Sequence, residues 1–105
     1  MRVLFDQGTP LPLRRQLHPN QVDSAAELGW SELENGELLA RAEAAGYAAL
    51  ITTDQQLRYQ QKLSGRRIRI IVLMTTSWPR IQRKAGEVLS VLERLAEGEY
   101  AEIVF

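Results

Sequence analysis

The chain has 105 residues, of which 45% are hydrophobic and 25% are charged, and its 13 basic and 13 acidic side chains give a net charge of zero. This length suits one domain, so we expect a single domain over residues 1–105 in the cytoplasm, where the absence of cysteine fits reducing conditions and excludes disulfides and thiolate metal sites. The apolar stretch of MRVLFD is too short for a signal peptide, and no run approaches the roughly 18 residues that cross a bilayer.

Short strands and helices alternate along the predicted chain. Strands are predicted at residues 2–5 (RVLF), 21–25 (strand or extended), 48–52, 67–74 and 100–105. Helices are predicted at residues 12–17, 25–30, 35–46 (with Asn35 as N-cap and Gly46 at the end), 55–63 and 79–97. This order predicts an α/β fold, a three-layer α/β/α sandwich with a mostly parallel sheet of about five strands. The final strand is either an edge or an internal strand.

Polar side chains follow three of these strands. Asp6 comes after the first strand, Thr52 and Asp54 end the strand over 48–52, and Thr75 and Trp78 follow the longest strand. Open parallel sheets place their ligand sites at the carboxyl ends of the strands. Two of the three aspartates of the chain therefore lie where a shared site is expected.

Four polar residues at or near these strand ends also have a purely local explanation. Asp6 can form an Asx-turn in DQGTP, and Thr53 followed by Gln56 matches a capping box. Asp54 suits the first turn of a helix because of the helix dipole, and Ser77 can cap the last helix. Taken together at one sheet edge, a shared site and these local roles remain equal alternatives.

Two converging carboxylates would require a compensating charge. Asp6 and Asp54 held about 5 Å apart would repel by roughly 3 kcal/mol at an effective dielectric constant near 20. A hard divalent ion such as Mg²⁺ or Mn²⁺ would offset this repulsion, because such ions take carboxylate and water oxygens. It could then activate water against a phosphodiester. Glu37, in the first turn of the predicted helix over 35–46, is the candidate third carboxylate.

A basic block lies between residues 55 and 86, where no acidic residue occurs. Its eight members are Arg58, Lys62, Arg66, Arg67, Arg69, Arg80, Arg83 and Lys84. A solvated face with salt bridges to the acidic segments explains the block at least as well as a binding surface does. The excess of arginine favours phosphate contacts, because guanidinium can donate two parallel hydrogen bonds to phosphate. Trp78 is a core or rim residue, or an aromatic contact for a nucleotide.

The segments VLFDQGTP, NGELLARAEAAG, ALITTDQQL and TTSWPRI, in this order, resemble the PIN-like superfamily. The most similar branch is a small, reduced one, whose members often occur as the presumed toxin of bacterial toxin-antitoxin pairs. The resemblance implies an α/β/α ribonuclease that depends on Mg²⁺ or Mn²⁺ and uses a cluster of three or four acidic residues. Asp6 matches the aspartate of the first strand, and Thr52 and Asp54 match the T-x-D motif.

The chain departs from the family pattern at two motifs, and the separate acidic helix that larger PIN domains insert early in the chain has no counterpart. Asn35 stands where the pattern has an aspartate at the helix start, and Gln56 and Leu57 stand where it often has aspartate and phenylalanine. The catalytic and metal-binding residues implied are Asp6 and Asp54, with Asn35 and Glu37 completing the set. The RNA contacts predicted are Thr52, Arg58, Arg66, Thr75, Trp78 and Arg80.

Two functions follow from this comparison. One is a metal-dependent ribonuclease, the toxin of a toxin-antitoxin pair. The other is a PIN-like module with weak or no catalysis that binds RNA or a partner protein such as an antitoxin. PIN-like proteins commonly pair, so a homodimer is expected, and no membrane partner is.

Overall fold

The computed structural model describes residues 1–60 and 62–105. Its elements are β1 (Arg2–Phe5), the 3₁₀ helix η1 (Leu11–Leu17), β2 (Gln21–Ser24), α1 (Asn35–Ala44), β3 (Ala49–Thr52), α2 (Leu57–Gln60), β4 (Arg69–Leu73), α3 (Trp78–Arg83), α4 (Ala85–Arg94) and β5 (Tyr100–Ile103). The strands form one sheet in the order β2-β1-β3-β4-β5, and every neighbouring pair is parallel. The predicted α/β class with five strands is confirmed.

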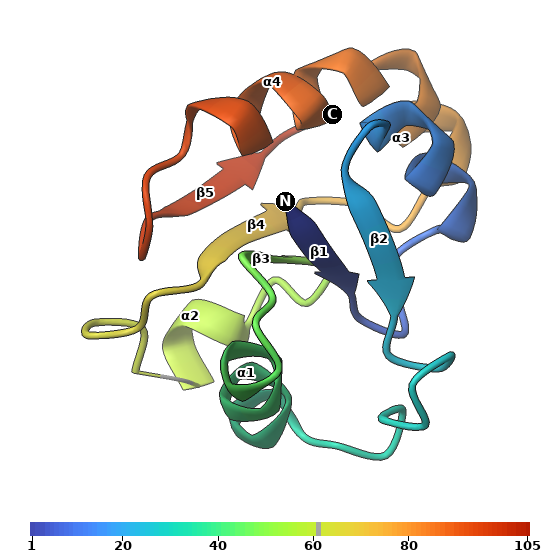
Figure 1. Ribbon diagram of the computed structural model, residues 1–105. Coiled ribbons are helices and arrows are strands. Elements are labelled where there is room, and N and C mark those ends of the chain that lie inside the picture. The colour runs from blue at the N-terminus through green and yellow to red at the C-terminus, as the bar shows by residue number, and fades with distance from the viewer. Residues whose placement is uncertain (61) are drawn as a thin grey trace.

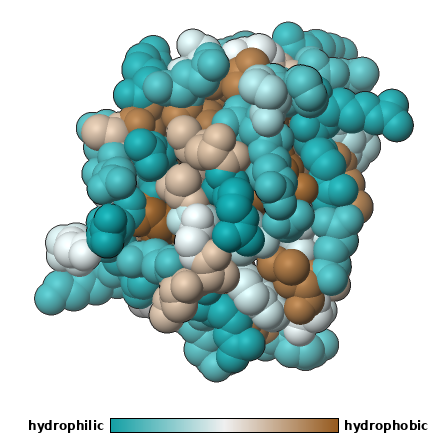
Figure 2. Space-filling view, in the orientation of Figure 1, coloured by the Kyte–Doolittle hydropathy of each residue, from teal (hydrophilic) through white to brown (hydrophobic). Residues whose placement is uncertain are grey.

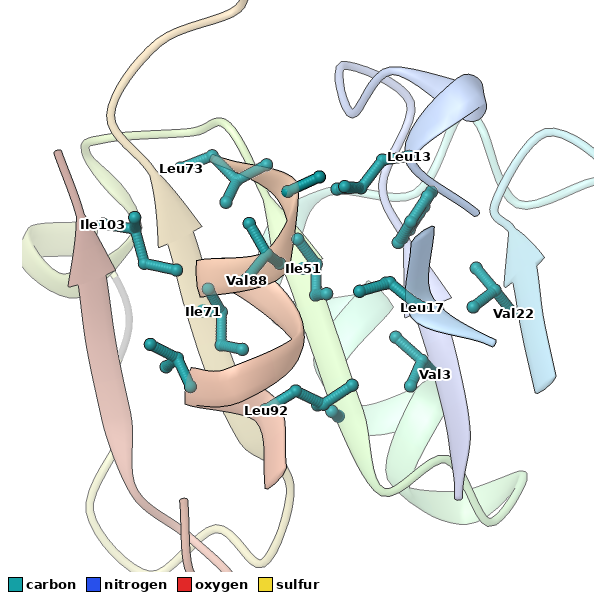
Figure 3. Packing of buried hydrophobic residues seen from close by; sticks show 14 of the residues in the cluster. Val3, Leu13, Leu17, Val22, Ile51, Ile71, Leu73, Val88, Leu92 and Ile103 are labelled. Carbon is teal, nitrogen blue, oxygen red and sulfur yellow. The ribbon is translucent and has the colours of Figure 1, made fainter. Parts of the chain in front are cut away.

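Helices cover both faces of the sheet, as Figure 1 shows, with α3 and α4 on one side and α1 and α2 on the other. Side chains alternate across each strand, so each face buries its own apolar set. In β3, Ala49 and Ile51 pack toward α4 and η1, while Leu50 packs toward α1. Figure 3 shows Val88 and Leu92 of α4 lying over the sheet. The surface facing the viewer in Figure 2 is mostly hydrophilic, with its hydrophobic residues in separate small patches.

Two of the predicted helices differ from the structure. Residues 25–30 form turns instead of a helix: Gly29 has a φ of 74°, and the Trp30 amide donates to the Ala25 carbonyl, which closes the segment after one turn. The helix predicted over 79–97 is two helices, α3 and α4, separated at Lys84, whose φ and ψ are −121° and 24°. Gly86, two residues after Lys84, lowers the local helix propensity.

Other boundaries agree more closely with the sequence. Helix α1 covers most of 35–46, but its N-cap is Glu34, so Asn35 is the first helical residue. Helix α2 is shorter than the predicted 55–63, of which residue 61 lies outside the described residues. Strand β5 is an edge of the sheet. Within the described ranges, none of the helices has the length and apolar character needed to span a bilayer.

Two glycines with similar backbone conformations allow a direct test of crowding. Gly65 and Gly98 have φ values of 83° and 77°, but a Cβ added at Gly65 meets nothing within 4 Å, whereas at Gly98 it would lie 2.6 Å from the Arg66 carbonyl oxygen. We expect Gly65→Ala to lower the free energy of unfolding by about 1 kcal/mol, the left-handed penalty alone. Gly98→Ala should lower it by about 3 kcal/mol, because backbone must also move. Urea denaturation of both variants measures the difference; equal losses would contradict the close approach.

Candidate functional site

Asp6 lies directly after β1, at the carboxyl edge of the sheet, and both of its carboxylate oxygens accept hydrogen bonds from threonine. The Thr9 hydroxyl lies 2.7 Å from Asp6 Oδ1 and 2.9 Å from the Ile51 carbonyl oxygen. The Thr52 hydroxyl donates to Asp6 Oδ2. Thr52 is only 1% exposed, so it orients the carboxylate from inside the sheet.

Asp54 lies at the same edge, after β3, and is joined to Asp6 through Thr52. The Asp54 amide donates to Thr52 Oγ1 at 3.0 Å, while Asn35 Nδ2 lies 2.5 Å from Asp54 Oδ2. Asp54 Oδ1 accepts from the Gln56 amide at 2.9 Å, a contact that the predicted capping box assigned to Thr53. Asp6, Thr52, Asp54 and Asn35 therefore form one hydrogen-bonded group, hereafter the carboxylate cluster.

The local roles predicted for the two aspartates coexist with this cluster. Asp6 accepts a hydrogen bond from the Gly8 backbone, as an Asx-turn requires, and Asp54 holds the Gln56 amide at the entrance to α2. Gly8 is required for close packing here, because a Cβ at this position would lie 2.6 Å from Thr53 Oγ1. Ser77 is the N-cap of α3 by backbone position, but its side chain makes no capping bond. Turn formation and a shared site are thus served by the same side chains.

Burial raises the pKa of Asp6 above its ordinary value of 3.8, because desolvation outweighs the hydrogen bonds from Thr52 and Thr9. The Asp54 charge contributes a smaller rise in the same direction. No Lys or Arg of the described residues forms an ion pair with either aspartate. The cluster therefore holds two acidic groups without a neutralising cation from residues 1–60 or 62–105.

The raised pKa of Asp6 predicts a pH dependence of stability. A carboxyl whose pKa is higher in the folded than in the unfolded state stabilises the fold below the unfolded value, and this contribution is lost as pH rises through the folded pKa. Wild type should therefore gain stability relative to Asp6→Asn as the pH falls from 7 toward 4. Urea denaturation of both proteins across this range measures it. If the free energy of unfolding of wild type minus that of Asp6→Asn stays constant or falls toward acid, burial does not raise this pKa.

A small pocket opens beside the carboxylate cluster. It has a volume of about 170 Å³, and Asp6, Gly8, Asn35, Ala25 and Trp30 are among its lining residues. Trp30 packs edge-on against Tyr47, with ring centroids 6.2 Å apart, and the Arg41 guanidinium lies over its ring. The pocket is therefore lined by one carboxylate of the cluster, that of Asp6, and by an aromatic side chain held by its neighbours.

The structure does not bring every predicted site residue to this pocket. Glu37 is exposed in the first turn of α1, and among residues 1–60 and 62–105 no group of three or more His, Cys, Asp or Glu side chains is arranged to hold a metal ion. Arg66 precedes β4 and so lies near the amino ends of the strands, away from the carboxylate cluster. There it pairs with Glu43 near the end of α1. Neither residue joins the carboxylate cluster.

The remaining predicted RNA contacts lie along the sheet edge or beside β5. Arg58 of α2 pairs with Glu102 of β5 at 3.4 Å and lies over the Tyr59 ring. Thr75 Oγ1 accepts from the Ser77 amide, and Trp78 packs against the core. Arg80, on α3, is exposed. The contact of Thr9 with Asp6 was not predicted. The sequence offered one signal for it, because Thr9 lies three residues after Asp6 within a predicted turn.

The residues present fit a hydrated hard cation. Mg²⁺ and Mn²⁺ often bind through one or two carboxylates and keep several waters. Asp6 accepts three hydrogen bonds and Asp54 accepts two among the described residues, so lone pairs remain on both carboxylates. The Asn35 amide is turned with its nitrogen toward Asp54, so Asn35 supports the carboxylate through a donated hydrogen bond.

Comparison of the chain with family models, with curated proteins and with solved structures found no match of any of the three kinds.

Proposed function

We propose that this chain is a cytoplasmic PIN-like ribonuclease, the toxin of a toxin-antitoxin pair, acting with Mg²⁺ or Mn²⁺ held by Asp6 and Asp54. The observation that supports it most is the carboxylate cluster, in which the Thr52 hydroxyl contacts the Asp6 carboxylate and the Asp54 backbone amide, and neither aspartate has a neutralising cation among the described residues. The bound ion would supply an activated water and offset charge on a phosphodiester. Homodimer formation and an antitoxin partner belong to the same proposal.

The protein's own residues hold and orient the two carboxylates. Thr9 and Thr52 donate to Asp6 and direct its oxygens, and Asn35 does the same for Asp54. Because Asp6 follows β1 directly and Asp54 follows the neighbouring strand β3 after one residue, the backbone fixes their spacing. The pocket beside Asp6, with Trp30 on its wall, offers space for part of a nucleotide.

A second candidate function is a PIN-like module that binds RNA or a partner protein with little or no catalysis. The observation in its favour is the size of the acidic set: Glu37 is exposed, and the described residues contain no group of three potential ligands. All four oxygens of Asp6 and Asp54 also accept hydrogen bonds already. In this case the cluster serves to hold the strand ends.

Titration with Mn²⁺ separates the two candidates. We expect calorimetry to detect Mn²⁺ binding to wild type and no binding to the Asp6→Asn, Asp54→Asn double variant, with RNA cleavage lost in parallel. Asp23→Asn is the matched control, because Asp23 lies in β2 and accepts a hydrogen bond from Tyr47 outside the cluster. If wild type neither binds Mn²⁺ nor cleaves RNA, the binding module is the function that remains.

A further inference from the structure

A second pocket, distinct from the carboxylate cluster, is surrounded by basic side chains. It has a volume of about 220 Å³ and is lined by Arg80, Arg83, Lys84 and Phe105. The three basic residues are exposed, and Phe105 is half-buried against the core that underlies α4. Three basic residues and one aromatic ring therefore line a single depression, most of whose surface is apolar.

The charges of this pocket are largely uncompensated. Among residues 1–60 and 62–105, neither Arg80 nor Arg83 has a carboxylate within ion-pair distance. Lys84 has only Glu87, at 4.0 Å on an exposed helix surface, a pair that contributes little. By contrast, Arg58 and Arg66 of the same basic block pair with Glu102 and Glu43. Arg58 and Arg66 thus belong to a solvated face with salt bridges, whereas Arg80 and Arg83 of the pocket have no such partner among the described residues.

The chemistry of the lining favours one class of ligand. Guanidinium groups bind phosphate through paired hydrogen bonds, and an aromatic ring can stack on a nucleobase. An acidic protein segment would use the cations but not the ring. The position of the pocket relates it to the carboxylate cluster. Phe105 follows β5, and Asp54 of the cluster follows β3. The carboxyl ends of these two strands are two strand spacings apart, about 10 Å.

We propose that Arg80, Arg83, Lys84 and Phe105 form a binding subsite for single-stranded RNA, in which the cations contact phosphate and Phe105 stacks on a base. The choice of RNA rests on the proposed function, but the contacts do not require catalysis. The subsite would hold a part of the RNA away from the phosphodiester that is cleaved.

Binding is measured by fluorescence anisotropy with a labelled 12-nucleotide single-stranded RNA in EDTA, so that cleavage plays no part. We expect Arg80→Gln, Arg83→Gln to weaken binding at least tenfold and to reduce the slope of log affinity against log salt by about 1.4, the value for two phosphate contacts on a single strand. The control, Arg67→Gln, Arg94→Gln, removes the same charge from exposed residues outside the pocket and should weaken binding less than threefold.

Phe105→Leu tests the stacking contact separately. It should weaken binding of the RNA about fivefold while leaving binding of an abasic strand of equal length unchanged. Equal effects of the two arginine pairs would overturn the subsite in favour of diffuse attraction, as would binding of polyglutamate with no binding of RNA. The assay contains EDTA, so it tests RNA binding even if the protein does not cleave RNA. If wild type does not bind the RNA, the subsite is ruled out, while the Mn²⁺ titration still tests the proposed function.

Discussion

Asp54→Asn is expected to reduce RNA cleavage by about 100-fold or more while the protein remains folded. The substitution removes one of only two carboxylate charges in the cluster, and metal-assisted hydrolysis depends on that charge. An asparagine at this position can still accept a hydrogen bond from the Gln56 amide through its carbonyl oxygen. The loss of the second acceptor, which now faces Asn35, should lower the free energy of unfolding by about 1 kcal/mol.

The measurement is initial-rate cleavage of a labelled single-stranded RNA at saturating Mn²⁺, with thermal unfolding of the same samples. Asp23→Asn, the third aspartate of the chain, is the control for preparation and for loss of one negative charge. Cleavage by Asp54→Asn at the wild-type rate would remove Asp54 from the chemistry and with it the ribonuclease assignment.

Asn35→Asp is expected to destabilise the protein in EDTA and to make its stability depend on Mn²⁺. Asn35 Nδ2 lies 2.5 Å from Asp54 Oδ2, so the substitution replaces a donated hydrogen bond by two facing carboxylates. Even after relaxation to about 5 Å, their repulsion is roughly 3 kcal/mol at an effective dielectric constant near 20. A cation bound between them would offset this repulsion, and binding to the folded state alone raises stability further.

Thermal unfolding with and without Mn²⁺ measures both effects. The expected pattern is a melting temperature below that of wild type in EDTA and a larger rise with Mn²⁺ than wild type shows. Asn20→Asp changes the only other asparagine of the chain, in the turn before β2, and should show no added dependence on Mn²⁺. If Asn35→Asp is as stable as wild type in EDTA, the short contact with Asp54 has no energetic importance.

Much of the fold was predictable because the local signals agree with one another. The apolar runs ending at Phe5, Thr52 and Leu73 are short, are bounded by turn residues and are separated by helical segments, which is the pattern of a parallel sheet covered on both faces. The break at Lys84 was not predictable from periodicity, since Ile81, Ala85 and Val88 keep helical spacing across it and all three are buried. The helix predicted over residues 25–30 was wrong because Gly29 ends the segment after a single turn.

The candidate site was only partly predictable. Strand-end position correctly placed Asp6, Thr52 and Asp54 at one edge, but the partner of each side chain depends on tertiary packing. Asn35 was expected to cap its own helix, and it reaches across to Asp54 because Glu34 takes the N-cap position. Arg66 was expected near phosphate, yet the crossover returns it to the opposite edge beside Glu43. The position of Arg66 was itself predictable, because a residue just before a strand of a parallel sheet lies at the end opposite the carboxyl ends.

The parallel order β2-β1-β3-β4-β5 also determines when the cluster can form during synthesis. Strand β1 is made first, but one of its two neighbours is β3, so the Asp6–Thr52 hydrogen bond joins residues 46 positions apart. Contacts of such long range close late, because the intervening chain must be ordered first. A nascent chain therefore has no assembled carboxylate pair until β3 has left the ribosome and docked, and the proposed activity can arise only after the centre of the sheet is complete.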